Sequence, residues 1–183
     1  MYSVTKTIHF CYGHRLLNYE GKCRYLHGHN GKVEIELASD QLDRLAMVRD
    51  FGEIKQVIQT WIDEELDHKM LLCRKDPVIA LLRQLGEPIF VMEANPTAEA
   101  IAQLIFEYAV SQGLPVTAVR LWETEGSVAT YSFDSPRTFG FAKRSRGGRS
   151  PARQARLPGR AGLRLAAGGR KTPRRVRSIS TAA

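Results

Sequence analysis

The segment Tyr2-Ser-Val-Thr-Lys-Thr-Ile-His-Phe-Cys-Tyr12 decides the class of fold, because apolar and polar residues alternate along it. The apolar residues stand at even positions: Tyr2, Val4, Ile8, Phe10 and Tyr12. This period of two predicts a half-buried β-strand, and His14 is the next residue on its apolar face. After a loop, Lys32-Val-Glu-Ile-Glu-Leu37 alternates in the same way and predicts a second strand.

Two helices are predicted downstream of these strands. From about residue 52 to residue 66, apolar residues at helical spacing line one stripe: Ile54, Val57, Ile58, Trp61, Ile62 and Leu66. Asn95-Pro-Thr97 supplies capping residues and a first-turn proline for a second long helix, which ends before Gly113 and Pro115. Between them, residues 77–85 predict a minor helix, and residues 89–92 a brief buried strand or loop.

The C-terminal part of the pattern completes an α+β fold. Residues 116–123 and 127–133 predict two strands, joined by the short turn Thr124-Glu-Gly126. The predicted order is therefore ββααββ. Two hairpins with two helices between them predict an antiparallel four-stranded sheet with both helices on one face.

Length and charge predict one domain followed by a basic tail. The chain has 183 residues, 43% of them hydrophobic, which is enough to bury one core of ordinary size. Residues 1–136 hold 13 Lys and Arg against 19 Asp and Glu, a net charge of −6. Residues 137–183 hold 14 Lys and Arg and no acids, which brings the total to +8. We expect this tail, poor in aromatic residues, to be disordered.

The cysteines and the N-terminus indicate the cellular compartment in which the protein is expected. The three cysteines form no CxxC pattern, so we expect free thiols in a reducing compartment. The N-terminus lacks a basic region followed by an apolar run, and no run of 18 apolar residues occurs. We therefore expect a cytoplasmic protein with no membrane partner.

Three histidines form a candidate metal site. In His27-Gly-His29, the two imidazoles share one face of an extended segment, since alternate residues of a strand point the same way. If the first two strands pair, His14 can join them, and three neutral imidazoles with one open position are typical of catalytic zinc. An HxH pair also arises by chance, and a single histidine has many other roles.

Other residues of the sequence are further candidates for a functional site. Cys23 lies between Lys22 and Arg24, which favour a thiolate, although an inert loop thiol fits the pattern as well. Cys11 and Cys73 are interpreted as small core residues. His68 could simply cap the first helix, and a hydrogen bond between Asp67 and His68 would require a turn there. Glu123 shares the parity of its buried strand neighbours, and a buried carboxylate needs donors.

With these residues in place, the chain resembles the 6-pyruvoyl-tetrahydropterin synthase family, which includes the bacterial 6-carboxy-tetrahydropterin synthases of queuosine precursor synthesis. The resemblance runs from about residue 3 to residue 133. Its motifs are Phe10-Cys-Tyr-Gly-His-Arg-Leu16, Cys23-Arg-Tyr-Leu-His-Gly-His-Asn30, Val48-Arg-Asp-Phe-Gly-Glu-Ile-Lys55, Leu66-Asp-His68, Asn95-Pro-Thr-Ala-Glu99 and Trp122-Glu-Thr124. Cys11-Tyr-Gly13 departs from the small residues usual before the first histidine.

The resemblance implies a role for each candidate residue. It implies that zinc is bound by His14, His27 and His29, that Cys23 abstracts a proton, and that Asp67 with His68 forms a second acid/base unit. It also implies a pocket for the pterin, anchored by Glu123 and lined by Thr97, Glu99 and Thr124. A carboxylate suits the anchor because the pterin presents two adjacent N–H donors.

The implied fold is the tunnelling fold, in which subunits join their sheets into a barrel, usually as a hexamer of two trimers with sites between subunits. The implied reaction converts 7,8-dihydroneopterin triphosphate to 6-carboxy-tetrahydropterin with loss of triphosphate and acetaldehyde. Zinc would hold the side-chain hydroxyls, and no external redox cofactor would be needed. The alternatives are 6-pyruvoyl-tetrahydropterin as product, or a zinc- or pterin-binding protein without activity.

Two interpretations of the tail remain. Its charge of +14, from 14 Lys and Arg and no acids, could neutralise nucleic-acid phosphates without sequence preference. Its Arg-Ala-Gly-Pro mixture is also typical of a reading frame that continues past a normal end. The second interpretation is favoured, and it predicts that deletion of residues 137–183 changes neither zinc content nor activity.

Overall fold

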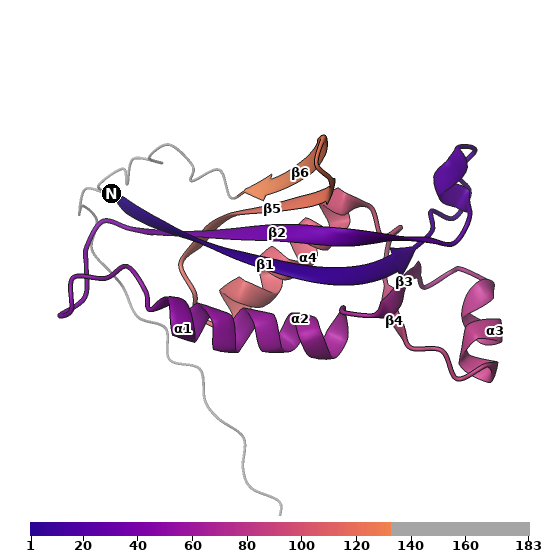
Figure 1. Ribbon diagram of the computed structural model, residues 1–183, viewed down its shortest axis with the longest axis horizontal. Coiled ribbons are helices and arrows are strands. Elements are labelled where there is room, and N and C mark those ends of the chain that lie inside the picture. Colours follow the sequence, from indigo (N-terminus) through magenta and orange to yellow (C-terminus); the bar gives the residue numbers. More distant parts are fainter. Residues whose placement is uncertain (133–183) are drawn as a thin grey trace, which may run out of the picture. The chain divides into compact units, whose positions relative to one another are not determined.

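A long antiparallel hairpin forms the centre of the sheet in the computed structural model, which describes residues 1–132 (Figure 1). Strand β1 (Tyr2–His14) pairs with β2 (His27–Ser39) along its whole length. The register places Val4 opposite Leu37 and His14 opposite His27. The predicted strands are confirmed, and both continue into the histidine motifs.

The sheet has six strands, which corrects the predicted four-stranded antiparallel sheet. Strands β5 (Val116–Thr124) and β6 (Ser127–Ser132) extend the hairpin antiparallel on the β2 side. On the β1 side, β3 (Lys69–Cys73) and β4 (Ile89–Met92) add in parallel, which gives the order β4-β3-β1-β2-β5-β6. Strand β3 lacks alternation because its last three residues are all buried, so it gave no period-two signal.

The helices are confirmed close to their predicted bounds. The first is continuous through α1 (Phe51–Ile54), one stretch of π-helix (η2, Lys55–Gln59) and α2 (Thr60–Glu65). The second is α4 (Ala98–Ser111), whose N-cap Thr97 accepts a hydrogen bond from the Ala100 amide. The minor helix is α3 (Val78–Gln84), and a short 3-10 turn, η1 (Lys22–Arg24), lies between β1 and β2.

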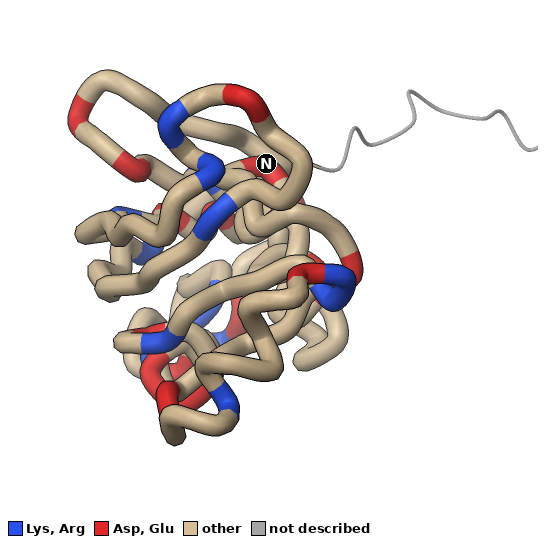
Figure 2. Tube along the Cα trace, turned by 90° about the vertical axis from the view of Figure 1, so that its right-hand side faces the viewer, with Lys and Arg blue, Asp and Glu red and all other residues tan. Residues whose placement is uncertain are grey.

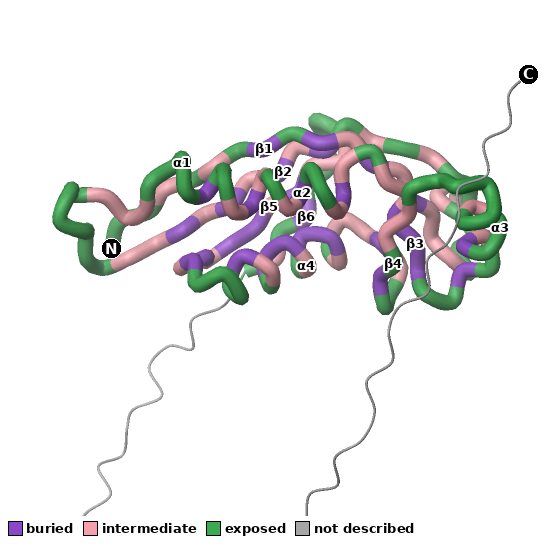
Figure 3. Tube along the Cα trace, turned by 90° about the horizontal axis from the view of Figure 1, so that it is seen from below, coloured by how far each residue is buried: buried purple, intermediate pink, exposed green. Residues whose placement is uncertain are grey.

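The core lies between one face of the sheet and both long helices (Figure 3). It joins side chains from the strands to the apolar stripes of the helices, including Phe10, Val33, Ile35, Leu121, Ile54, Ile58, Ile62, Ile101 and Ile105. Burial of these stripes explains the helical spacing seen in the sequence. The predicted packing of both helices on one face is thus confirmed.

Charges of both signs are interspersed along the described part of the chain (Figure 2). Among residues 1–132, no helix is long and apolar enough to cross a membrane. All three cysteines fall in this range, and none forms a disulfide, as expected. The predicted domain end at residue 136 and the predicted disordered tail at residues 137–183 lie outside the described residues.

Candidate metal centre

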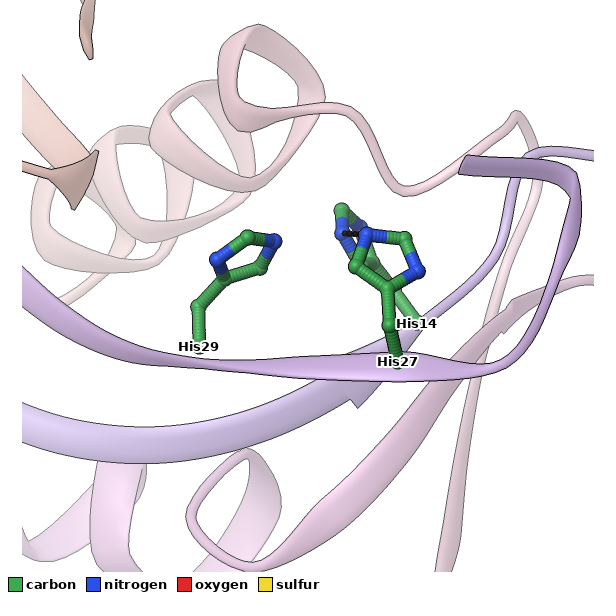
Figure 4. A group of neighbouring side chains, drawn as sticks. All are labelled: His14, His27 and His29. Carbon is green, nitrogen blue, oxygen red and sulfur yellow. Dashed lines mark hydrogen bonds between the residues drawn. The ribbon is translucent and has the colours of Figure 1, made fainter. Parts of the chain in front are cut away.

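The paired ends of β1 and β2 bring the three predicted histidines together (Figure 4). His14 ends β1 opposite His27, and His29 lies opposite Tyr12, so alternation puts all three rings on the helix-covered face. One ring nitrogen of each histidine lies within 4.8 Å of the others. His14 is buried and the other two are half-buried, so the group is anchored in the core and reachable from outside.

Main-chain carbonyls fix the tautomers of two of these rings. Nδ1 of His14 donates to the Pro96 carbonyl at 2.6 Å, and Nδ1 of His27 donates to the Tyr25 carbonyl at 2.8 Å. The Nε2 atoms, 3.0 Å apart, therefore face each other with their lone pairs when both rings are neutral. Burial lowers the pKa of His14, which opposes a proton between them. Facing lone pairs with carbonyl partners behind them fit a bound metal ion.

The turn Asn95-Pro96-Thr97 connects this centre to the rest of the site. Pro96 orients His14, Thr97 caps α4, and Asn95 holds the loop after β1. The Asn95 amide accepts from the Leu17 N–H at 2.8 Å and donates to the Leu17 carbonyl at 3.0 Å. This two-bond contact ties the segment that carries Cys23 to the start of α4, a role that sequence spacing did not indicate.

A cavity beside the triad contains most of the predicted pocket residues. Its volume is about 260 Å³, and it is lined in part by His14, Cys23, Thr97, Glu99 and Glu123. Thr124 lies outside it and lines a second cavity of about 700 Å³ with His29 and Glu123. The chain thus brings the Cys23 thiol, the Glu123 carboxylate and the His14 imidazole together around one cavity.

Asp67 and His68 lie elsewhere, with Cys11. The helix ends at Glu65, His68 adopts a φ of +55°, and its Nδ1 donates to Asp67 at 2.7 Å, so the turn that this hydrogen bond requires is present. Asp67 also accepts from the Cys11 amide at 2.7 Å. The Cys11 thiol donates to Asn30 at 3.1 Å, on the sheet face opposite the triad.

The prediction for the other two cysteines is half right. Cys73 is buried, as predicted for a small core residue. Cys11 is half-buried on the open face, and its thiol lies within 4.8 Å of the Asp67 and His68 ligand atoms. Cys11 stands at an odd position in β1, so its side chain lies on the face away from the apolar residues at even positions. The alternation of the strand in the sequence already indicated this.

Tyr12 is a site residue that the sequence interpretation counted only as core. It is buried, its ring lies edge-on to His14 with 5.4 Å between ring centroids, and its hydroxyl donates to Glu123 at 3.0 Å. Burial, reinforced by the Glu123 carboxylate, raises the pKa of Tyr12, so the hydroxyl remains a donor. This bond supplies the donor that a partly buried Glu123 was expected to need.

Fold and site together define an α+β protein with a histidine centre suited to a metal ion. Residues 3–134 match the family model described as 6-pyruvoyl tetrahydropterin synthase. The chain belongs to this family.

Curated relatives agree with the family match. The 6-carboxy-5,6,7,8-tetrahydropterin synthase of Rickettsia conorii is 39% identical over 131 residues, which cover 68% of this chain and 95% of that protein. The enzyme of the same name from Haemophilus influenzae is 32% identical over 139 residues, which cover 72% of this chain and 99% of that protein. The matched region thus spans nearly the whole length of these relatives.

Solved structures support the tunnelling fold. An uncharacterized protein from Wolinella succinogenes matches with a TM-score of 0.62 and 29% identity, over 72% of this chain and 97% of that one. The 6-pyruvoyl tetrahydropterin synthase of Caenorhabditis elegans matches with a TM-score of 0.55 and 21% identity, over 72% of this chain and 95% of that one. Because the sequence identity of the second match is only 21%, that match supports the fold alone.

Proposed function

We propose that the protein is a zinc-dependent lyase that converts 7,8-dihydroneopterin triphosphate and one water molecule to 6-carboxy-5,6,7,8-tetrahydropterin, with release of acetaldehyde and triphosphate. The observation that carries this proposal is the pair of facing Nε2 atoms of His14 and His27, 3.0 Å apart, in a site where Cys23 and Glu123 line the adjoining cavity. The names of the relatives favour the carboxy product. A role in queuosine precursor synthesis in the cytoplasm belongs to the same proposal.

His14, His27 and His29 would hold the zinc ion, since neutral imidazoles are among its preferred ligands. Zinc held there would supply Lewis-acid chemistry, which would make a C–H next to a side-chain hydroxyl of the substrate more acidic. The rings come from a rigid hairpin, and two of them have carbonyl partners that fix their orientation. Glu123, with Oε1 at 3.7 Å from His14 Nε2, lies close enough for one ligand to reach both groups.

Three further groups of this chain would bind the substrate and move protons. Cys23, as a thiolate, would take a proton from the substrate side chain, and His68, held by Asp67, would act as the second acid/base group. Glu123 would accept hydrogen bonds from the adjacent N–H donors of the pterin. The side chain loses the electrons that the ring gains, so no external redox cofactor is needed.

The complete set of groups would come from more than one subunit. Cys23 lines the cavity on the helix-covered face, whereas Asp67 and His68 accompany Cys11 and Asn30 on the opposite face. A symmetric oligomer can bring these two faces together because each subunit offers both. We propose a hexamer of two trimers, as the resemblance implies.

The reaction products test the proposal. Zinc-loaded protein incubated with 7,8-dihydroneopterin triphosphate should release acetaldehyde and triphosphate in equal amounts. Release of triphosphate without acetaldehyde would instead identify a 6-pyruvoyl-tetrahydropterin synthase. If neither product forms with zinc bound, the remaining alternative is a zinc- or pterin-binding protein.

A cysteine variant separates catalysis from binding. Cys23→Ala should abolish turnover and leave the zinc content unchanged, because the thiol is not among the three clustered ligands. Cys73→Ala is the matched control, since Cys73 is buried away from the cavity and should affect stability without affecting turnover per folded chain. If the wild type and Cys23→Ala are equally inactive, the result would contradict an enzymatic role and favour a zinc- or pterin-binding protein.

A further inference from the structure

Tyr12 fills the space between the histidine centre and the core. Its ring stacks on Phe10 with 5.2 Å between centroids and meets His14 and His29 at 5.4 and 5.9 Å. The neighbouring strand makes room for it with a glycine, because a Cβ at Gly31 would lie 3.0 Å from ring atom Cε1. The ring is therefore held on several sides and has little freedom to change rotamer.

The hydroxyl of this fixed ring reaches across the sheet to Glu123. Tyr12 lies on β1 and Glu123 on β5, with β2 between them, and the hydroxyl donates to Oε1 at 3.0 Å. Within residues 1–132, it is the one hydrogen-bond donor that the structure gives the Glu123 side chain. The carboxylate, partly exposed in the cavity wall, thus takes its orientation from a rigid buried group.

We propose that Tyr12 is a positioning residue that holds the Glu123 carboxylate ready for a ligand with two adjacent N–H donors. This inference rests on the proposed function, in which the pterin is that ligand. An ionised carboxylate has about four lone-pair sites, so one bond from Tyr12 leaves both oxygens able to accept from the ligand. A carboxylate oriented in advance loses less rotamer entropy on binding, so the hydroxyl strengthens binding without contact with the ligand.

Tyr12→Phe tests the role of the hydroxyl because it keeps the packed ring. The probe is 7,8-dihydroneopterin, which lacks the triphosphate leaving group and can be studied by calorimetric titration at equilibrium. We expect Tyr12→Phe to bind it about tenfold more weakly than the wild type, the effect of losing one hydrogen bond to a charged group. With the triphosphate substrate, KM should rise by a similar factor while kcat changes little, as expected for uniform binding.

A second substitution shows whether Tyr12 acts through Glu123. In a Glu123→Gln background, the carboxylate is already absent, so adding Tyr12→Phe should weaken binding much less than it does in the wild type. Zinc content and thermal unfolding report whether each variant folds. Tyr108→Phe is the matched control, since that ring stacks on Trp61 at 4.1 Å, away from the cavity, and should bind like the wild type.

The possible outcomes separate this inference from the proposed function. Wild-type binding that Tyr12→Phe leaves undiminished would overturn the role of Tyr12 alone. A loss of the same size in the wild-type and Glu123→Gln backgrounds would also overturn it, because it would mean a general effect of packing. Absence of any binding of 7,8-dihydroneopterin to the zinc-loaded wild type would overturn the proposed function and this inference with it.

Discussion

The Nε2 atoms of His14 and His27 lie 3.0 Å apart, while both Nδ1 atoms donate to main-chain carbonyls. Two neutral rings in this arrangement direct lone pairs at each other, which is unfavourable without a shared cation. The surrounding fold imposes the geometry, because paired strands carry the two histidines and His14 is buried. The close pair therefore supports the proposed metal site, in which these two rings and His29 would be the three ligands.

The first prediction concerns metal content. His27→Ala should lower zinc affinity by about a hundredfold or more, since only two clustered imidazoles would remain. The measurement is zinc bound per chain after dialysis against a chelator. His9→Ala provides the control, because His9 is exposed at an odd position of β1, the strand that carries His14, and its loss should leave the zinc content full. Full zinc retention by His27→Ala would contradict the assignment.

Sequence alternation predicted that the three histidines could come together, because the face on which a strand residue lies depends on local rules. His14 continues the apolar face of a strand, and His27 with His29 shares a face in the next strand, so pairing was enough to bring the rings together. The long helices followed in the same way from apolar stripes that the core buries. The period of the apolar residues can be read directly from the sequence, whereas the pairing of the two strands was a condition that the structure supplies.

Long-range contacts escaped prediction for the same reason. Pro96 orients His14 through a main-chain carbonyl, which leaves no mark on residue type, and Tyr12 contacts Glu123 across β2. Strand β3 is short and its last three residues are all buried, so period-two alternation could not indicate it. Its place beside β1 also puts His68 near Cys11, a contact between residues 57 positions apart.

The second prediction concerns the loop that carries Cys23. Asn95→Ala removes both hydrogen bonds to Leu17, so the loop should loosen. We expect kcat to fall about tenfold, consistent with the loss of two ordinary hydrogen bonds, while zinc stays bound because Pro96 still orients His14.

Labelling of Cys23 by a thiol reagent, followed by mass spectrometry, should be faster in Asn95→Ala than in the wild type. Gln103→Ala is the control, since Gln103 contacts Glu107 on the exposed face of α4. This substitution should change neither the rate of Cys23 labelling nor kcat. Unchanged labelling together with unchanged kcat would show that the Asn95 contact does not position the thiol.

The third prediction tests whether sites are shared between subunits. Cys23→Ala and His68→Ala should each be inactive alone, but mixed subunits should regain activity. In a random equal mixture, about one quarter of the sites would combine an intact Cys23 from one subunit with an intact His68 from another. Turnover measured after subunit exchange, relative to that of the wild type, gives the fraction of sites that have both residues intact. No recovery in verified mixed oligomers would place both residues in one chain's site.

The last prediction concerns stability in acid. Arg15 and Asp76 form a bidentate pair that joins the end of β1 to the start of α3, and the Asp76 side chain is buried. The hydrogen bonds from Arg15 lower the pKa of Asp76 from the usual 3.8. Because the folded pKa is the lower one, the stabilisation is complete above about pH 5 and is lost as the pH falls through the folded pKa.

Asp76→Asn should therefore cost about 2 kcal/mol of unfolding free energy at pH 7, since the pair is partly buried and asparagine still accepts hydrogen bonds. The difference from the wild type should shrink as the pH falls below 4, because the Asp76 carboxyl of the unfolded chain then takes up a proton while the ion-paired carboxylate of the folded chain, with its lowered pKa, does not. Urea unfolding of the wild type and of Asp76→Asn between pH 7 and pH 3 measures the difference in unfolding free energy at each pH.

Glu93→Gln is the control, because it breaks the exposed ion pair with Arg74 and should change the unfolding free energy by no more than about 0.5 kcal/mol. A cost for Asp76→Asn that stays constant down to pH 3 would show that packing, and not the ionised pair, provides the stabilisation.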